Sequence, residues 1–318
     1  MTKQFVTYFR WILLLLVVMV LFPGCEKDID LKLKKGGGKL VLFSFLVPDS
    51  VFSVHLSRSV SYSSIDDFER VYDGSVKVFQ NGTLIDTFDY PFRDLWAQRE
   101  QVDVRAGESY VVQASDALGN VVSGSVTIPL AVPIEKLDTV RILTPDDRGI
   151  LRSYIDCSIT FTDPAQDENY YQLLMAEEFW DTNGTGIKYS YQLVNFIKLD
   201  PVFYIRDQEG SLLGGIDFKG TFHDELFNGK RYHLKIRIPS TYVIPPALKQ
   251  KRRLTFLLLS QSRDYFDYLR SRVVAEYNYE IPIVDPIKIH SNVEGGLGLV
   301  GGLSVAADSL VFNGDAMK

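Results

Sequence analysis

Residues 75–89 have the sequence SVKVFQNGTLIDTFD, in which the dipeptide Asn81-Gly82 separates two alternating runs. Alternation of apolar and polar residues is typical of a β-strand that buries one face. Asn-Gly tolerates the positive φ angles of a two-residue hairpin turn. The stretch therefore predicts a β-hairpin.

The same pattern continues along most of the chain, where short segments rich in Val, Phe and Tyr are separated by Gly, Asn, Asp or Pro. Further strands are expected at Lys39–Val47, Val51–Ser57, Ser109–Ser115, Asn120–Pro129, Leu151–Thr162, Tyr170–Phe179, Lys188–Leu199, Arg231–Pro239 and Arg253–Gln261. Closely spaced strands of this kind predict an all-β fold of sandwiches or barrels.

One stretch, residues 262–278, has helical spacing instead. Phe266, Leu269, Arg270 and Val273 recur at three- and four-residue intervals, and the stretch contains no Gly or Pro. We expect one amphipathic helix there, with its apolar stripe packed on a sheet.

Pro129 and Pro133 interrupt a strand-like region and suggest a domain boundary near residue 132. The predicted N-terminal domain, residues 39–131, has the size of one immunoglobulin-like or transthyretin-like sandwich. The predicted C-terminal β-rich domain, residues 132–318, contains the helix.

The N-terminus has the layout of a secretion signal. Basic Lys3 and Arg10 precede or flank an apolar run, Trp11–Phe22, which ends at Pro23-Gly24-Cys25. The run is shorter than the roughly 20 apolar residues that cross a bilayer. We predict a lipoprotein signal peptide at residues 1–24 and lipid attachment at Cys25. The alternative is an N-terminal anchor helix with an incidental cysteine.

Residues 25–38 predict a lipidated tether that is acidic at its start and ends in Gly36-Gly37-Gly38.

Charge and cysteine content exclude some function classes. Lys plus Arg number 34 and Asp plus Glu number 40, so removing Lys3 and Arg10 leaves 32 against 40, a net charge of −8. This balance repels nucleic acid. The one basic run, Lys249–Arg253, is expected to be a solvated turn. Apart from Cys25 the chain has only Cys157, whose alternating surroundings predict a buried hydrophobic side chain.

Gly296, Gly298 and Gly301 match the spacing G-x-G-x-x-G of a dinucleotide loop. Such a loop needs a helix after it, whereas the residues that follow Gly302 alternate as a strand does. We therefore expect a closing strand in which the glycines allow bulges or a close backbone approach.

No catalytic, metal or cofactor site is predicted. The sequence lacks G-x-S-x-G, H-E-x-x-H and C-x-x-C, and the four histidines are far apart in sequence. His55 and His233 are expected to be packed within strands, and His223 and His290 to lie at element edges. Asp163, Asp167 and Glu168 have the proximity of calcium ligands but not the register of a known calcium loop.

The chain resembles the Bacteroidota lipoproteins of domain-of-unknown-function family 4249. The likeness is carried by the start CEKDIDL (25–31), KLV (39–41), VHLSRS (54–59), FHDELFNGKRY (222–232), YFDYLRS (265–271) and the tail SNVEGGLGLVGG (291–302). Two positions depart from the family: Phe43-Ser44-Phe45 stands where a Glu-Gly pair is frequent, and Val300 where an aromatic is common.

The resemblance implies a lipid-anchored outer-membrane protein that faces the cell exterior. Glu26, Lys27 and Asp28 are similar to the export signal that sends lipoproteins to the cell surface in these bacteria. The alternative is that they form a plain polar tether. It also implies a non-enzymatic binding or accessory subunit that works with a TonB-dependent outer-membrane transporter. The rival hypotheses are an adhesin or envelope-organising structural lipoprotein and, less favoured, a hydrolase.

Overall fold

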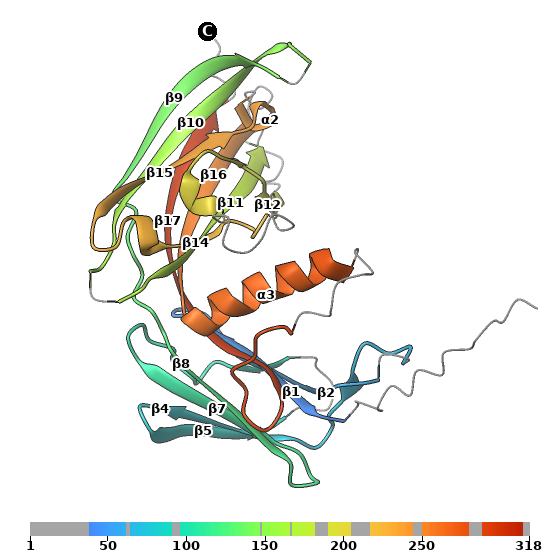
Figure 1. The fold of residues 1–318 in the computed structure, drawn as a ribbon. Coiled ribbons are helices and arrows are strands. Elements are labelled where there is room, and N and C mark those ends of the chain that lie inside the picture. Colours follow the sequence, from blue (N-terminus) through green and yellow to red (C-terminus); the bar gives the residue numbers. More distant parts are fainter. Residues whose placement is uncertain are drawn as a thin grey trace, which may run out of the picture. The chain divides into compact units, whose positions relative to one another are not determined.

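The computed structural model of the chain describes residues 38–61, 64–90, 96–146, 148–165, 167–181, 190–204, 217–243, 250–279 and 288–313. They form an all-β protein with one long helix, α3 (Arg263–Tyr279), and both features confirm the sequence prediction (Figure 1). No helix within these ranges is long and apolar enough to span a membrane. The predicted signal peptide, Cys25 and the tether as far as Gly37 lie outside the described residues.

Three sheets contain nearly all of the structure. The largest is a nine-stranded sheet with the order β12-β11-β16-β17-β1-β2-β3, in which β14 also pairs with β11 and β6 with β2. The other two have the orders β13-β15-β10-β9 and β5-β4-β7-β8. The strands are β1 (Leu40–Leu46), β2 (Phe52–Arg58), β3 (Glu69–Arg70), β4 (Ser75–Gln80), β5 (Thr83–Asp89), β6 (Ala97–Arg99), β7 (Ser109–Ser115), β8 (Val121–Thr127), β9 (Lys136–Pro145), β10 (Leu151–Thr162), β11 (Tyr170–Asp181), β12 (Ser190–Val194), β13 (Ile197–Lys198), β14 (Thr221–His223), β15 (Arg231–Ile238), β16 (Gln250–Gln261) and β17 (Leu297–Asn313).

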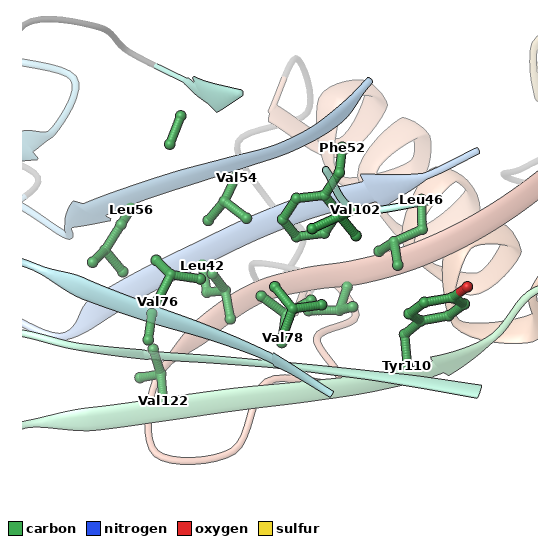
Figure 2. Packing of buried hydrophobic residues seen from close by; sticks show 14 of the residues in the cluster. Leu42, Leu46, Phe52, Val54, Leu56, Val76, Val78, Val102, Tyr110 and Val122 are labelled. Atoms are coloured by element: carbon green, nitrogen blue, oxygen red, sulfur yellow. The ribbon is translucent and has the colours of Figure 1, made fainter. Parts of the chain in front are cut away.

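The first core lies between β1 and β2 on one side and the sheet β5-β4-β7-β8 on the other. Figure 2 shows Leu42, Val54, Val78 and Tyr110 of this core interdigitating, and each of them is fully buried. The predicted hairpin is confirmed, because β4 pairs with β5 across a turn in which Asn81 and Gly82 both have positive φ.

The second core lies between the sheet β13-β15-β10-β9 and the strands β11, β16 and β17. Alternate residues of β10, from Ile155 to Phe161, face it together with Leu234, Met175 and Phe256. Cys157 is one of them and is buried as predicted.

Strand β17 belongs to both sandwiches. Its residues 297–302 pair in parallel with β1, and its residues 303–313 pair antiparallel with β16. Val300 accordingly lies in the first core, whereas Leu310 and Phe312 pack against the second. Along the chain, Ile128 belongs to the first core and Val132 to the second. The domain boundary near residue 132 stays a prediction, because β17 contributes to both sandwiches.

The glycine-rich tail is the closing strand that the sequence predicts. A Cβ atom on Gly296 would collide with the carbonyl oxygen of Leu40, and one on Gly298 with that of Leu42. Only glycine permits the backbones of β1 and β17 to approach this closely.

One sequence interpretation is wrong. The basic run was expected to be a solvated turn, yet its residues 250–253 begin β16. Arg252 points toward the second core and forms a 2.9 Å ion pair with buried Glu177 of β11, while Arg253 pairs at 3.1 Å with Glu178 on the opposite face. Cross-strand acidic partners, which are not visible from the local sequence, make a basic strand end possible.

Candidate functional site

Both cores lie on the same side of the nine-stranded sheet, and we call its other side the outer face. In β1, Leu42 and Ser44 face the first core, so Phe43 and Phe45 project from the outer face. The strand pairing places Phe43 opposite His55 of β2 and Leu299 of β17, and Phe45 opposite Gly301.

Helix α3 packs on this face through two tyrosines. The ring of Tyr265 lies 5.6 Å from that of Phe45, and the ring of Tyr268 lies 5.9 Å from that of Phe43, both edge-on. A Cβ atom on Gly301 would come within 2.9 Å of the Tyr265 ring, so glycine there lets the helix lie close to β17. Burial raises the pKa of Tyr265.

The rings of His55, Phe68 and Trp96 complete what we call the aromatic cluster. The centroid of His55 lies 5.3 Å from that of Phe68 and 5.5 Å from that of Trp96, and Trp96 lies 6.1 Å from Phe45. His55 is buried, and the other members are partly exposed. The cluster consists of Phe43, Phe45, His55, Phe68, Trp96, Tyr265 and Tyr268.

The other side of α3 contacts the second sandwich. Phe266 is buried, and its ring lies 4.8 Å from that of Tyr170 on β11. The guanidinium of Arg270 lies 4.9 Å above the ring of Phe218. These contacts hold the helix against both halves of the nine-stranded sheet, as the predicted packing of its apolar stripe requires.

Beyond the helix the outer face carries exposed apolar side chains. Tyr191 and Leu193 of β12 are each 61% exposed, and Val305 and Val311 of β17 are 42% and 48% exposed. Partly exposed Leu174 and Leu257 lie opposite each other on the strands between them. We call these six residues the outer-face patch.

The strand register shows that these side chains share one face. Tyr191 is opposite Glu178, Glu178 is opposite Arg253, and Arg253 is opposite Val311. The Glu178–Arg253 ion pair lies within this row, and the Arg253 guanidinium lies 5.1 Å above the ring of Trp180. Solvent-facing sides of antiparallel sheets are usually polar, so the exposed apolar side chains on both sides of this ion pair make the outer face a candidate interaction surface.

The four histidines do not form a catalytic constellation in the described residues. His55 lies 3.0 Å from Ser57 Oγ, and His233 lies 2.9 Å from Thr160 Oγ1 on β10. His223 and His290 each face a carboxylate, at 3.7 Å from Glu225 and 2.8 Å from Asp264. Within the same residues no group of three or more His, Cys, Asp or Glu is arranged to hold a metal ion.

The carboxylates considered as calcium ligands have separate partners. Buried Asp163 accepts hydrogen bonds from the Tyr171 hydroxyl and, at 2.8 Å, from the Gly229 N–H. Burial raises the pKa of Asp163. Glu168 instead accepts from the Tyr170 hydroxyl at 2.7 Å. Asp163 therefore anchors the FHDELFNGKRY segment, and its geometry does not support the calcium hypothesis.

The sequence contained a signal for the outer face that alternation alone did not reveal. Leu40–Leu46 and Leu254–Leu259 are nearly continuous apolar runs, which indicate strands covered on both faces. The predicted export residues Glu26, Lys27 and Asp28, and the lipid site Cys25, lie outside the described residues.

Comparison with known protein families gives a match over residues 26–309 to the family described as "Domain of unknown function (DUF4249)". No curated protein matches the sequence. The chemistry of the outer face follows from its own residues. Partly exposed rings and exposed aliphatic side chains bind a partner through complementary shape and burial of apolar surface.

Proposed function

The chain belongs to the DUF4249 family, and from this premise we propose that it is an outer-membrane lipoprotein that acts as a non-enzymatic binding subunit. In this proposal Cys25 bears the lipid and the body faces the cell exterior. Its partner is a TonB-dependent outer-membrane transporter, as the family resemblance implies.

The observation that carries the proposal is the outer-face patch. Four of its side chains, Tyr191, Leu193, Val305 and Val311, are at least 42% exposed. Removing apolar surface from water stabilises association by about 25 cal/mol per Å² before the costs of binding are subtracted. Tyrosine is enriched among the residues that dominate interface energies, which makes Tyr191 the strongest single contributor expected in the patch.

The lipid anchor supports the same function. An anchored protein diffuses in the plane of its membrane partner, which raises the effective concentration of the two surfaces. An interface of modest affinity is then occupied. A hydrolase would not need this arrangement of apolar residues.

Affinity purification tests the proposal. Tagged lipoprotein, solubilised gently, is expected to recover a transporter in near-stoichiometric amount. The double variant Tyr191→Ser/Leu193→Ser is expected to lose most of this recovery, because two interface side chains worth about 1.4 kcal/mol each would together weaken binding about 100-fold.

The matched control is Leu143→Ser/Leu151→Ser. These leucines are 72% and 68% exposed on β9 and β10, which belong to the sheet that covers the second core. Surface substitutions change the free energy of unfolding by only about 0.5 kcal/mol, so both variants remain folded. Equal loss in both variants would remove the outer face from the proposal.

Other results would replace the function altogether. Recovery of the lipoprotein alone in several mild detergents would overturn the accessory-subunit proposal. Binding to matrix or envelope components, with uptake unchanged, would indicate the adhesin or structural alternative. Hydrolytic turnover that is abolished by changing one histidine or carboxylate would indicate an enzyme.

A separate prediction concerns the side of the membrane. Replacing Glu26, Lys27 and Asp28 together by Ala is expected to change the body from protease-accessible on intact cells to protected, with membrane attachment unchanged. Equal digestion of both forms would mean that these residues are only a tether.

A further inference from the structure

The body has a second exposed apolar region, at the end where the chain enters from the tether. The Gly38 N–H donates to the Ser59 carbonyl at 2.7 Å, which places the entry point beside the end of β2. Arg58, the last residue of β2, forms a 2.6 Å ion pair with Asp116 in the turn between β7 and β8.

That turn is firmly built. The Asp116 carboxylate accepts hydrogen bonds from the Asn120 backbone N–H at 2.9 Å and from its side-chain amide at 2.8 Å, and its side chain is fully buried. The Gly119 N–H donates to the Asp116 carbonyl at 3.1 Å. The turn holds Leu118 in solvent, 78% exposed.

A second exposed apolar side chain follows on the same turn. Val121, at the start of β8, is 49% exposed. Neither Leu118 nor Val121 belongs to the first core. Apolar loop tips of this kind are suited to a lipid surface.

The length of the tether identifies the occupant. Glu26 to Gly38 is 13 residues, a length of chain that spans at most about 45 Å when fully extended. A folded body of roughly 280 residues has a radius of gyration of about 19 Å. A compact body with this radius of gyration is about 50 Å wide. Even when fully extended, the 13-residue segment is therefore shorter than the body is wide, so the entry end stays within one body width of the bilayer that holds the anchor.

We infer that Leu118, with Val121, touches the acyl-chain boundary of the bilayer that holds the lipid anchor. This contact rests on the proposed lipid at Cys25. It would orient the body so that the end where the chain enters faces the bilayer, which is distinct from binding a partner through the outer face. Arg58 and Asp116 beside the turn neutralise each other in their ion pair, so the attraction is apolar and a zwitterionic bilayer suffices.

Site-specific labelling tests the contact on the full lipoprotein. Leu118→Cys is labelled with the environment-sensitive fluorophore NBD and reconstituted into phosphatidylcholine vesicles. Labelling is selective because a lipidated Cys25 has no free thiol, and burial raises the pKa of the Cys157 thiol to about 12. Leu143→Cys on β9, which is similarly exposed at 72%, is the control.

At position 118 we expect emission at shorter wavelength, protection from aqueous iodide and quenching by nitroxide lipids. At position 143 we expect the spectrum of a probe in water. Aqueous spectra at both positions on vesicle-bound protein would overturn the inference and leave the anchor intact, and lipid-type spectra at both would overturn the stated orientation. An unmodified Cys25 by intact mass, with no protein on the vesicles, would overturn the anchor and the inference together.

Discussion

Gly298→Ala is expected to destabilise the folded protein strongly. Gly298 has φ +116°, and its added Cβ would collide with the Leu42 carbonyl oxygen and lie 2.9 Å from the Leu42 nitrogen. These are backbone atoms of the paired strand β1, so no side-chain rotation relieves the contact. The parallel pairing at 297–302 would separate and expose Val300 and the first core to water.

The expected cost is about 2 to 5 kcal/mol, from about 1–2 kcal/mol for a side chain in the left-handed region and about 1–3 kcal/mol for overpacking. Natural domains unfold with about 5–15 kcal/mol, so this loss is a large fraction of the total. Denaturant titration measures it as a lower midpoint.

Two glycine variants separate the causes. Gly82→Ala has a positive φ of +79° with nothing within 4 Å of the added Cβ, so it should cost only the conformational part, about 1–2 kcal/mol. Gly296 has no positive φ, and a Cβ there would collide with the Leu40 carbonyl oxygen and with Val122. Gly296→Ala should therefore cost only the overpacking part, about 1–3 kcal/mol. If Gly298→Ala and Gly82→Ala cost the same, close approach of β1 and β17 is not what requires glycine.

Cys25→Ala is expected to remove the protein from the membrane or to stall it as an uncleaved precursor. In the proposed function the Cys25 thiol carries the lipid, and each buried methylene contributes about 0.8 kcal/mol to membrane binding. Several acyl chains hold a protein effectively permanently, and the variant without the thiol cannot receive them. Membrane fractionation with intact-mass measurement detects either outcome.

Cys157→Ala is the matched control. Cys157 lies in the second core, and its loss removes packing without touching the N-terminus. Its membrane fraction should equal that of the unaltered protein, although it should unfold more easily. A Cys25→Ala protein that is processed and remains membrane-bound would contradict lipid anchoring.

Local patterns were sufficient for much of the fold. The strands at Ser75–Gln80, Ser109–Ser115 and Leu151–Thr162 occur at the predicted residues, because alternation and turn dipeptides are properties of neighbouring residues. The helix at Arg263–Tyr279 was predicted within one residue at each end for the same reason. The chemistry of the N-terminal segment also depends only on adjacent residues.

The candidate site was not accessible in this way. Phe43 of β1, Tyr268 of α3 and Trp96 are distant in sequence. Only the packing of α3 and the pairing of β2 with both β1 and β6 bring them into one cluster. The same holds for Glu178 and Arg253, whose attraction allows a basic run to form a strand. Sequence patterns contain no information on which distant strands pair.

By itself the sequence determined the all-β class, most of the longer strands, the helix and the closing role of the glycine-rich tail, and the lipid anchor stays a prediction. Only the tertiary structure decided that β17 divides between two sandwiches and that one continuous face receives the helix and the apolar patch. The physical reason is that hydrogen-bond partners and burial on the second face of a strand depend on long-range contacts. Strand propensity is local, whereas the surface available to a partner is a property of the assembled sheet.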